Sequence, residues 1–269
     1  MRNVAFFCVL SLMWFGCGSN GTSTGAKSND TVLTSEQDKV DSKPDKASVS
    51  GDSLKQRSTV GNYLLNGKDT LLPVDTYNKN IYWELKYATT DNFMHRVLYD
   101  TLDILYLQAD VVRRLSKAQE KLTAINEDYH LLVYDGVRPL SVQWEMWNAL
   151  DSIPVSQRGL FVSNPANGSV HNYGAAVDLT ICNGKRIPLD MGAGYDDIRK
   201  IAYPSLEKQF LASGELTKAH ISNRELLRKI MRSQRFSGIP SEWWHFNAYS
   251  RAVSKNRYGV VKYELLPKK

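Results

Sequence analysis

The stretch Ser169–Asp178, with the sequence SVHNYGAAVD, determines how the second half of this chain is expected to fold. Gly174 indicates a backbone position that needs a positive φ angle or a close approach by another segment. The residues after it, Ala175 to Val177, are small and apolar, which is typical of a buried strand. The pattern therefore predicts a turn followed by a strand that carries Asp178 toward the interior.

A second stretch, Glu242–Phe246 (EWWHF), supplies a further histidine. His171, Asp178 and His245 together offer two imidazoles and one carboxylate, a ligand set that suits four-coordinate zinc with one position left open for water. One anionic ligand leaves such a site with a charge of about +1, so the metal can still acidify that water. The two stretches predict a catalytic zinc site with one ion per chain, although the ligand types also allow another divalent metal.

Glu242 precedes His245 by three residues and is expected to project toward the same region from a turn or short helix. It is the candidate general base. Taken singly, each of these side chains is more often a hydrogen-bonded structural residue than a metal ligand. The grouping favours the metal, because two of only five histidines fall in the two stretches. His95, His130 and His220 are interpreted as structural or surface residues.

The N-terminus has the pattern of an export signal. Arg2 is followed by an apolar run, Val4 to Phe15, which is too short to cross a membrane stably, and then by Gly16-Cys17 and an abrupt change to polar residues. The end of the run is similar to a bacterial lipoprotein cleavage site, and a plain secretory signal is the alternative. We predict a signal peptide over residues 1–17 with Cys17 as the lipidation site. The protein would then be exported to the cell envelope or periplasm and anchored to a membrane by lipid.

Residues 18–59 are rich in Ser, Lys, Asp, Gly and Thr without a helical or strand period, and are predicted to form a flexible linker. Residues 60–269 form the predicted catalytic domain. Removal of the signal would discard Cys8 and leave Cys182 as the remaining free thiol, so no internal disulfide is expected. The chain has a net charge of +6, but its basic residues are dispersed and form no runs with aromatic residues. This pattern argues against nucleic-acid binding.

Hydrophobic periodicity in the domain predicts mixed helices and strands. Apolar residues recur at helical spacing from about Asp100 to Asn126, and a strand follows over His130–Tyr134. A helix over Ser141–Leu150 would place Trp144 and Trp147 on one face. No regular strand–helix–strand alternation is present, which favours a single α+β domain with a small antiparallel sheet.

Two further expectations concern the C-terminal half. Ser222 should cap a helix that ends before Gly238-Ile239-Pro240. The segments that carry the zinc ligands, Val170–Ile181 and Glu242–Tyr249, are expected to form an antiparallel strand pair.

The order of these motifs resembles the zinc D-alanyl-D-alanine dipeptidases of the vancomycin-resistance type. YDGVRP at residues 134–139 is similar to the arginine strand of that family, and it is followed by S-x-H-x-x-G-x-A-x-D and then by EWWHF. YATTDNF at residues 87–93 looks like the N-terminal signature of the family, and LDMG at residues 189–192 like the segment after the zinc strand. The resemblance covers roughly Tyr82 to Phe246 and implies the hedgehog/DD-peptidase fold, a small α+β layer arrangement.

The resemblance implies a role for each matching residue. His171, Asp178 and His245 would bind zinc, Glu242 would be the catalytic base, and Arg138 would polarise or stabilise the scissile carbonyl. The reaction requires residues of the same kinds, because peptide hydrolysis needs an activated water, an acceptor for its proton and positive charge beside the developing oxyanion. A guanidinium suits the last task because it stays charged and donates in a fixed fork. The alternative for Arg138 is a structural ion pair.

A dipeptidase must also recognise both charged ends of a small D-amino-acid dipeptide. Ser169 is a candidate hydrogen-bonding residue for the substrate, and Asp196 or Asp197 could hold its ammonium group. An Asp pair after Gly-Tyr is also common at a helix N-terminus, which is the structural alternative. Trp243 and Trp244 could line the pocket or could fix a ligand by packing. The sequence does not indicate the oligomeric state.

Two other functions fit the same motifs. A DD- or LD-carboxypeptidase would use the same zinc site to trim peptidoglycan stem peptides, but the paired tryptophans and the signature at residues 87–93 favour the dipeptidase branch. A non-catalytic zinc-containing module that binds the cell envelope would need neither a base nor an oxyanion donor, yet Glu242 and Arg138 are both present. The expected function is hydrolysis of D-Ala-D-Ala, with recycling or scavenging of dipeptides outside the cytoplasm as its purpose.

Overall fold

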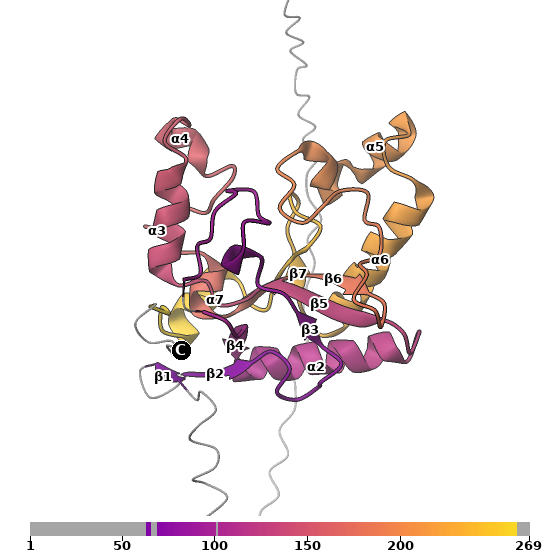
Figure 1. The fold of residues 1–269 in the computed structure, drawn as a ribbon, viewed down its shortest axis with the longest axis horizontal. Coiled ribbons are helices and arrows are strands. Elements are labelled where there is room, and N and C mark those ends of the chain that lie inside the picture. The colour runs from indigo at the N-terminus through magenta and orange to yellow at the C-terminus, as the bar shows by residue number, and fades with distance from the viewer. Residues whose placement is uncertain (1–62, 66–68, 101, 263–269) are drawn as a thin grey trace, which may run out of the picture. The chain divides into compact units, whose positions relative to one another are not determined.

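Two β-sheets and six α-helices make up the described part of the chain (Figure 1). The computed structural model describes residues 63–65, 69–100 and 102–262, and all of these belong to one compact unit. The predicted signal peptide with Cys17 and the predicted linker lie outside these residues. Within the described ranges, no helix is both long enough and apolar enough to cross a membrane. The mixture of helices and mostly antiparallel strands confirms the predicted α+β class.

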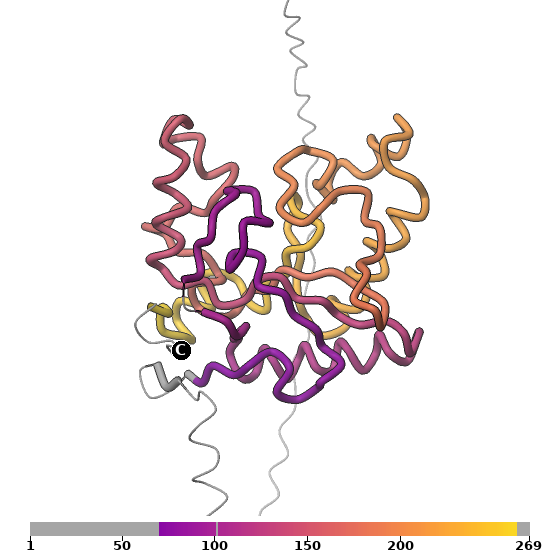
Figure 2. The backbone as a smooth tube through the Cα atoms, viewed as in Figure 1, coloured from indigo at the N-terminus to yellow at the C-terminus, as the bar shows by residue number. Residues whose placement is uncertain are grey.

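The larger sheet brings together strands that are far apart in the sequence (Figure 2). In spatial order, its strands are β3 (Tyr82–Trp83), β5 (His130–Asp135), β6 (Ala176–Cys182), β8 (His245–Asn247) and β7 (Ser237–Gly238). The predicted antiparallel pairing of the two ligand segments is confirmed for β6 and β8, although residues 170–173 precede β6 as a short 3-10 helix. The sheet is mostly antiparallel, as predicted, but β3 runs parallel to β5.

The first predicted helix begins later than its apolar pattern indicates. Tyr106–Gln108 form strand β4, which pairs with β2 (Asp69–Pro73) in an antiparallel sheet that also contains β1 (Tyr63–Leu65). Helix α2 runs over Ala109–Thr123, so the prediction of a helix from about Asp100 is wrong. All three β4 residues are buried. A short run that is apolar on both faces cannot be distinguished from a buried helical segment by its period.

Helix α3 (Leu140–Ala149) lies where the sequence predicted it. Its two tryptophans lie on the same side of the helix but differ in burial, because Trp147 is buried and Trp144 is 41% exposed. Residues three apart differ by about 60° around a helix, and the edge of the buried face passes between these two side chains.

Helix α6 (Lys218–Ser233) is capped by Thr217 and not by Ser222. The Thr217 hydroxyl accepts a hydrogen bond from the His220 backbone N–H at 3.2 Å, and the His220 ring accepts one from the Thr217 N–H at 3.1 Å. This is a capping box in which His replaces the usual Glu or Gln, so the usual sequence signature is missing. The helix ends before Gly238, as predicted.

The remaining helices are short and lie between or after the strands. They are α4 (Val155–Arg158), α5 (Glu207–Ser213) and α7 (Arg251–Arg257), with the 3-10 helices η1 (Lys86–Ala88), η2 (Val170–Tyr173), η3 (Lys200–Ala202) and η4 (Pro204–Leu206).

The two faces of the larger sheet carry different residues. Val133 of β5 and Leu179 of β6 belong to the main hydrophobic core, against which α2 packs. A bulge after Val133 shifts the register of β5, so that Asp135 pairs directly with Asp178. Without the extra residue, strand alternation would send Asp135 to the core face. His245 pairs with Asp178 on the other side, and the three polar residues form one row across β5, β6 and β8.

Candidate metal centre

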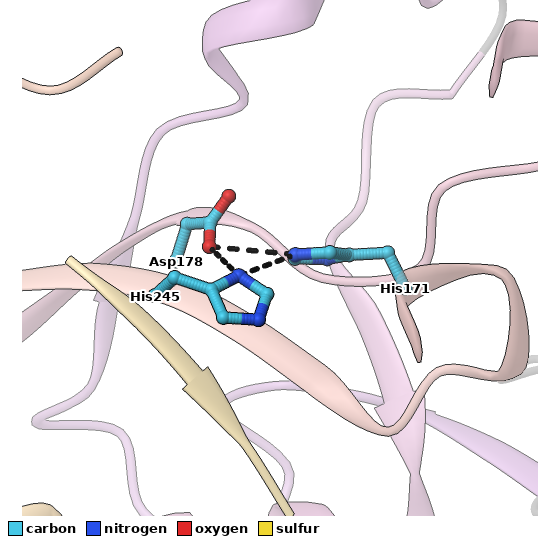
Figure 3. A group of neighbouring side chains, drawn as sticks. All are labelled: His171, Asp178 and His245. Carbon is cyan, nitrogen blue, oxygen red and sulfur yellow. Dashed lines mark hydrogen bonds and ion pairs between the residues drawn. The ribbon is translucent and has the colours of Figure 1, made fainter. Parts of the chain in front are cut away.

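His171 of η2 lies beside this row, and its side chain converges with those of Asp178 and His245 (Figure 3). The Asp178 Oδ1 atom lies 2.9 Å from His245 Nδ1 and 3.4 Å from His171 Nε2, and the two nitrogens are 3.2 Å apart. Two ligands of a tetrahedral zinc ion with bonds of about 2.0–2.1 Å are separated by about 3.3 Å. The three donor atoms therefore match one face of a zinc tetrahedron.

Local backbone structure places each ligand. Asp178 and His245 are direct cross-strand partners, which keeps their side chains on one face and close together. His171 lies on η2, which begins at the N-cap Ser169 and ends at Gly174. Gly174 has a φ of +64°, and a Cβ atom there would come within 3.0 Å of the Val137 side chain, so both predicted reasons for a glycine are confirmed.

Hydrogen bonds on the far side of each ring select the tautomer that a metal requires. His171 Nδ1 lies 2.8 Å from the Gly136 carbonyl oxygen, which can only accept a proton. His245 Nε2 lies 3.0 Å from Asn247 Oδ1. In the neutral rings, the His171 Nε2 and His245 Nδ1 lone pairs therefore face the common point. The donor set fits zinc in its element types, spacing and tautomers.

The ligands share a strong electrostatic coupling in the metal-free protein. Burial opposes ionisation of Asp178, but the adjacent His171 and His245 lower its pKa well below the usual range. Burial also opposes the charge of His245, but its hydrogen bond to Asp178 raises the His245 pKa to about 9. A proton thus holds His245 and Asp178 together at neutral pH, and a metal ion must displace it.

Glu242 stands beside the ligands without belonging to them. Its Oε2 atom is 3.9 Å from His245 Nδ1, and it lies on the bend that leads into β8. Burial raises the pKa of the Glu242 carboxyl, with the nearby charge of Asp178 as a further cause. A carboxylate of raised basicity next to the metal ligands is suited to accept a proton from water.

Arg138 is held rigidly behind the ligands. Its Nε and Nη2 atoms donate to Asp135 Oδ2 at 3.0 and 2.6 Å, and its Nη1 donates to Gln143 Oε1 at 3.3 Å. The guanidinium carbon stacks 5.0 Å from the centre of the Tyr87 ring. Nη2 also lies 3.7 Å from Asp178 Oδ2. The ion pair proposed as the structural alternative is present, and it positions the arginine at the site at the same time.

Asp135 is one of the site residues that sequence reasoning missed. It is fully buried, and its Oδ1 atom accepts from the Tyr99 hydroxyl at 2.6 Å and from the Gly136 N–H at 2.9 Å. In the sequence it stands inside the YDGVRP motif, in which only Arg138 was assigned a role. The available signal was its spacing, because a carboxylate three residues before Arg138 can pair with it across a tight turn.

The metal centre opens into a cleft that contains the remaining predicted residues. Ser169, Asp196, Asp197 and Trp244 all line it, whereas Trp243 does not. Neither aspartate caps a helix, so the structural alternative for this pair is wrong. The rest of the lining includes Arg251 and several apolar side chains, which sequence reasoning did not single out: Met146, Leu160, Phe161, Val162, Val170, Ile198, Tyr203 and Ile239.

Asp196 and Asp197 differ in their partners. Asp197 accepts two hydrogen bonds from the Arg199 guanidinium, at 2.9 and 2.6 Å, and is thereby neutralised. Asp196 has a φ of +58°, and its Oδ2 atom is buried without a hydrogen-bond partner. Burial raises the pKa of Asp196 well above its usual range, and the charge of Asp178 raises it further. Backbone strain and an unsatisfied carboxylate oxygen are typical of a residue that awaits a ligand.

The chain is similar to known dipeptidases over most of its described residues. A family model described as "Peptidase_M15: D-ala-D-ala dipeptidase" matches residues 68–262. The chain is 35% identical over 163 residues to the D-alanyl-D-alanine dipeptidase of Escherichia coli (strain K12), across 61% of this chain and 76% of that protein. It is 30% identical over 190 residues to the D-alanyl-D-alanine dipeptidase of Enterococcus faecalis (strain ATCC 700802 / V583), across 64% and 88% of the two chains.

One solved structure is also similar. It is a crystal structure of a mutant of the vancomycin resistance D,D-pentapeptidase VanY in complex with Zn(II). The match has 14% identity and a TM-score of 0.30 and covers 58% of this chain and 81% of that chain. A score at this level bears on neither the fold nor the metal of the present chain.

Replacing Asp135 with Asn should lower the free energy of unfolding by about 3 kcal/mol or more, because the buried Arg138 charge would lose its partner. Urea denaturation of the metal-free protein measures the change. Asp91→Asn is the matched control, since Asp91 pairs with Lys86 but its side chain is 78% exposed. That pair should contribute less than about 1 kcal/mol. Equal effects of the two substitutions would contradict the assigned role of Asp135.

Zinc binding to the metal-free protein should release about one proton per chain at pH 7, because the His245 pKa is about 9. The apparent affinity should rise about tenfold per pH unit as pH increases toward 9, since metal and proton compete for His245 Nδ1. Calorimetry in two buffers of different ionisation enthalpy measures both quantities. His171→Ala should abolish binding and His220→Ala should not. An affinity independent of pH would show that no proton competes at His245.

Proposed function

The chain belongs to the peptidase M15 family of D-Ala-D-Ala dipeptidases, and from this premise we propose that it is a zinc metallopeptidase that hydrolyses free D-alanyl-D-alanine. Family membership supports a dipeptidase reaction. The convergence of His171, Asp178 and His245 supports the metal.

Asp196 carries the choice of a free dipeptide over a longer peptide. In D-Ala-D-Ala an ammonium group lies next to the scissile bond, whereas a peptidoglycan stem has a neutral amide at that position. The buried Asp196 Oδ2 atom has no hydrogen-bond partner, and leaving such a group unsatisfied costs about 1–3 kcal/mol. A substrate ammonium would satisfy this oxygen and stabilise the ionised carboxylate, while a neutral amide would not supply the charge. Asp197 is the weaker candidate, because Arg199 already neutralises it.

Zinc would be held by His171 Nε2, His245 Nδ1 and a carboxylate oxygen of Asp178, and when bound it supplies a Lewis acid that polarises the peptide carbonyl and acidifies water. Glu242 accepts the proton of the attacking water and returns it to the leaving amine, for which its raised pKa is suited. The two neutral tautomers are maintained by Gly136 and Asn247.

Arg138 stabilises the negative charge that develops on the carbonyl oxygen. Its Nε and Nη2 atoms are bound by Asp135, while Nη1 has only a longer contact of 3.3 Å with Gln143. Nη1 therefore retains donor capacity for the oxyanion. The fixed position is important, because a guanidinium that needs no reorganisation during the reaction stabilises the transition state more effectively.

We also propose that the enzyme acts outside the cytoplasm as a lipid-anchored protein. The support is the N-terminal sequence alone, with an apolar run before Gly16-Cys17 and a polar linker over residues 18–59. At that location the reaction would recycle or scavenge dipeptides.

The zinc-loaded protein should release alanine from free D-Ala-D-Ala and not from a pentapeptide stem that ends in D-Ala-D-Ala. Glu242→Gln should retain one zinc per chain and reduce kcat by about 10²–10⁴-fold, because the proton acceptor is lost. His171→Ala should lose both metal and activity. Amino-acid release, together with metal analysis of each variant, tests the proposal. Cleavage of the stem would indicate a carboxypeptidase, and no cleavage by the zinc-bound protein would indicate a binding module.

Replacing Asp196 with Asn should raise KM for D-Ala-D-Ala by about tenfold or more, as expected for the loss of a hydrogen bond to a charged group. Asparagine tolerates the positive φ angle, so the backbone should keep its conformation. Steady-state kinetics are compared with Asp197→Asn, which should change KM much less. If both variants bind the dipeptide as well as the unmodified enzyme does, the ammonium is held elsewhere.

A further inference from the structure

We propose that Arg251 binds the C-terminal carboxylate of the dipeptide and thereby sets the direction in which the substrate lies across the metal centre. This inference rests on the proposed function and deepens it, because it concerns the same cleft. It assigns a specificity-determining role to a residue on α7, outside every motif that the sequence analysis identified.

The first observation is the lack of a partner for Arg251. It lines the cleft and is solvent-exposed. Some arginines in the described ranges pair with carboxylates, such as Arg257 with Asp110 and Arg199 with Asp197, and others, such as Arg114 and Arg158, donate to backbone carbonyl oxygens. No carboxylate in the described part of the chain pairs with Arg251. Its guanidinium is therefore free to bind an anionic group that enters the cleft.

The second observation is the charge balance of the cleft. Four carboxylates line it: Asp178, Asp196, Asp197 and Glu242. Among the described residues, only two arginines and no lysines line the same cleft. Arg138 is already paired with the buried Asp135. Asp178 belongs to the metal centre and Asp197 is paired with Arg199, so Asp196 and Glu242 are the carboxylates of the cleft that would repel a dipeptide carboxylate. Of the two arginines that line the cleft, Arg251 is the one that no described carboxylate pairs with.

The third observation is the position of Arg251 in the fold. It is the first residue of α7, which packs against η2. Ser169 is the N-cap of η2, and its Oγ atom accepts only a long hydrogen bond of 3.4 Å from the His171 N–H. The Ser169 hydroxyl proton remains available as a donor. Arg251 and Ser169 thus come from two packed elements that flank the His171 ligand.

These positions imply an orientation for the dipeptide. Its ammonium binds Asp196 on the loop after β6, and its carboxylate binds Arg251 and Ser169 at the packed η2 and α7. The scissile bond then lies between these two contacts, beside the metal ligands. A guanidinium suits the carboxylate because it can donate two parallel hydrogen bonds, which also fixes the direction of the substrate.

The test compares D-Ala-D-Ala with its C-terminal amide, which lacks the negative charge. The unmodified enzyme should have a kcat/KM for the free acid at least about tenfold above that for the amide. Arg251→Ala should remove this preference by raising KM for the acid, with little change for the amide. Arg251→Lys should restore part of it, because the charge remains but the fork is lost. Lys255→Ala is the matched control, since Lys255 is an exposed cation on α7 that does not line the cleft.

Calorimetric binding of the acid and the amide to zinc-loaded Glu242→Gln provides a readout that does not depend on turnover. Adding Arg251→Ala to this variant should weaken binding of the acid alone. The inference is overturned if Arg251→Ala weakens the acid and the amide equally, or if the unmodified enzyme cleaves both equally well. Absence of cleavage of any free dipeptide would instead refute the proposed function, and the role of Arg251 would fall with it.

Discussion

The metal centre depends on the register in which β6 pairs with its two neighbours. Asp178 stands opposite Asp135 on one side and opposite His245 on the other, so a single row of side chains crosses three strands. A slip of one residue in either pairing would move ligands to the face that packs against α2. The bulge in β5 is part of this constraint, because it turns Asp135 away from the core and toward Asp178. The packing of one face of the sheet against α2 thus fixes the register that brings the metal-site residues together on the other face.

The buried charges around this row are organised by Asp135. One of its carboxylate oxygens binds Arg138 twice, and the other accepts from Tyr99 and from a backbone N–H. Such a carboxylate has nearly all of its acceptor capacity filled, which makes its burial tolerable. The same set of bonds holds Arg138 within 3.7 Å of Asp178. A structural ion pair and the placement of a cation beside the metal ligands are therefore one arrangement.

In the proposed function, the charges of the cleft would favour a small zwitterion. Among the described residues, the buried Asp196 Oδ2 atom on one wall has no hydrogen-bond partner, and no carboxylate pairs with Arg251 on another element. Most other charged groups that line the cleft are neutralised within the protein or belong to the metal centre and its base. A free dipeptide carries one charge for each of these two residues, whereas a peptide in the interior of a chain carries neither. Recognition of both substrate ends would then select the peptides that are cleaved, and the metal centre would carry out the hydrolysis.

The sequence by itself determined the candidate metal-binding trio, the glycine turn before β6, the antiparallel pairing of the segments that carry the trio and the α+β class, because each follows from local spacing and residue type. It did not predict β4, where burial on both faces hides the strand period, or the cap of α6, where His220 replaces the usual residue. Only the tertiary structure distinguished Asp196 from Asp197 and brought Asp135 and Arg251 to the site. Those properties depend on which atoms are buried, paired or left free after packing. These properties arise from contacts between segments that are far apart in the chain, and the spacing of residues along the sequence does not indicate such contacts.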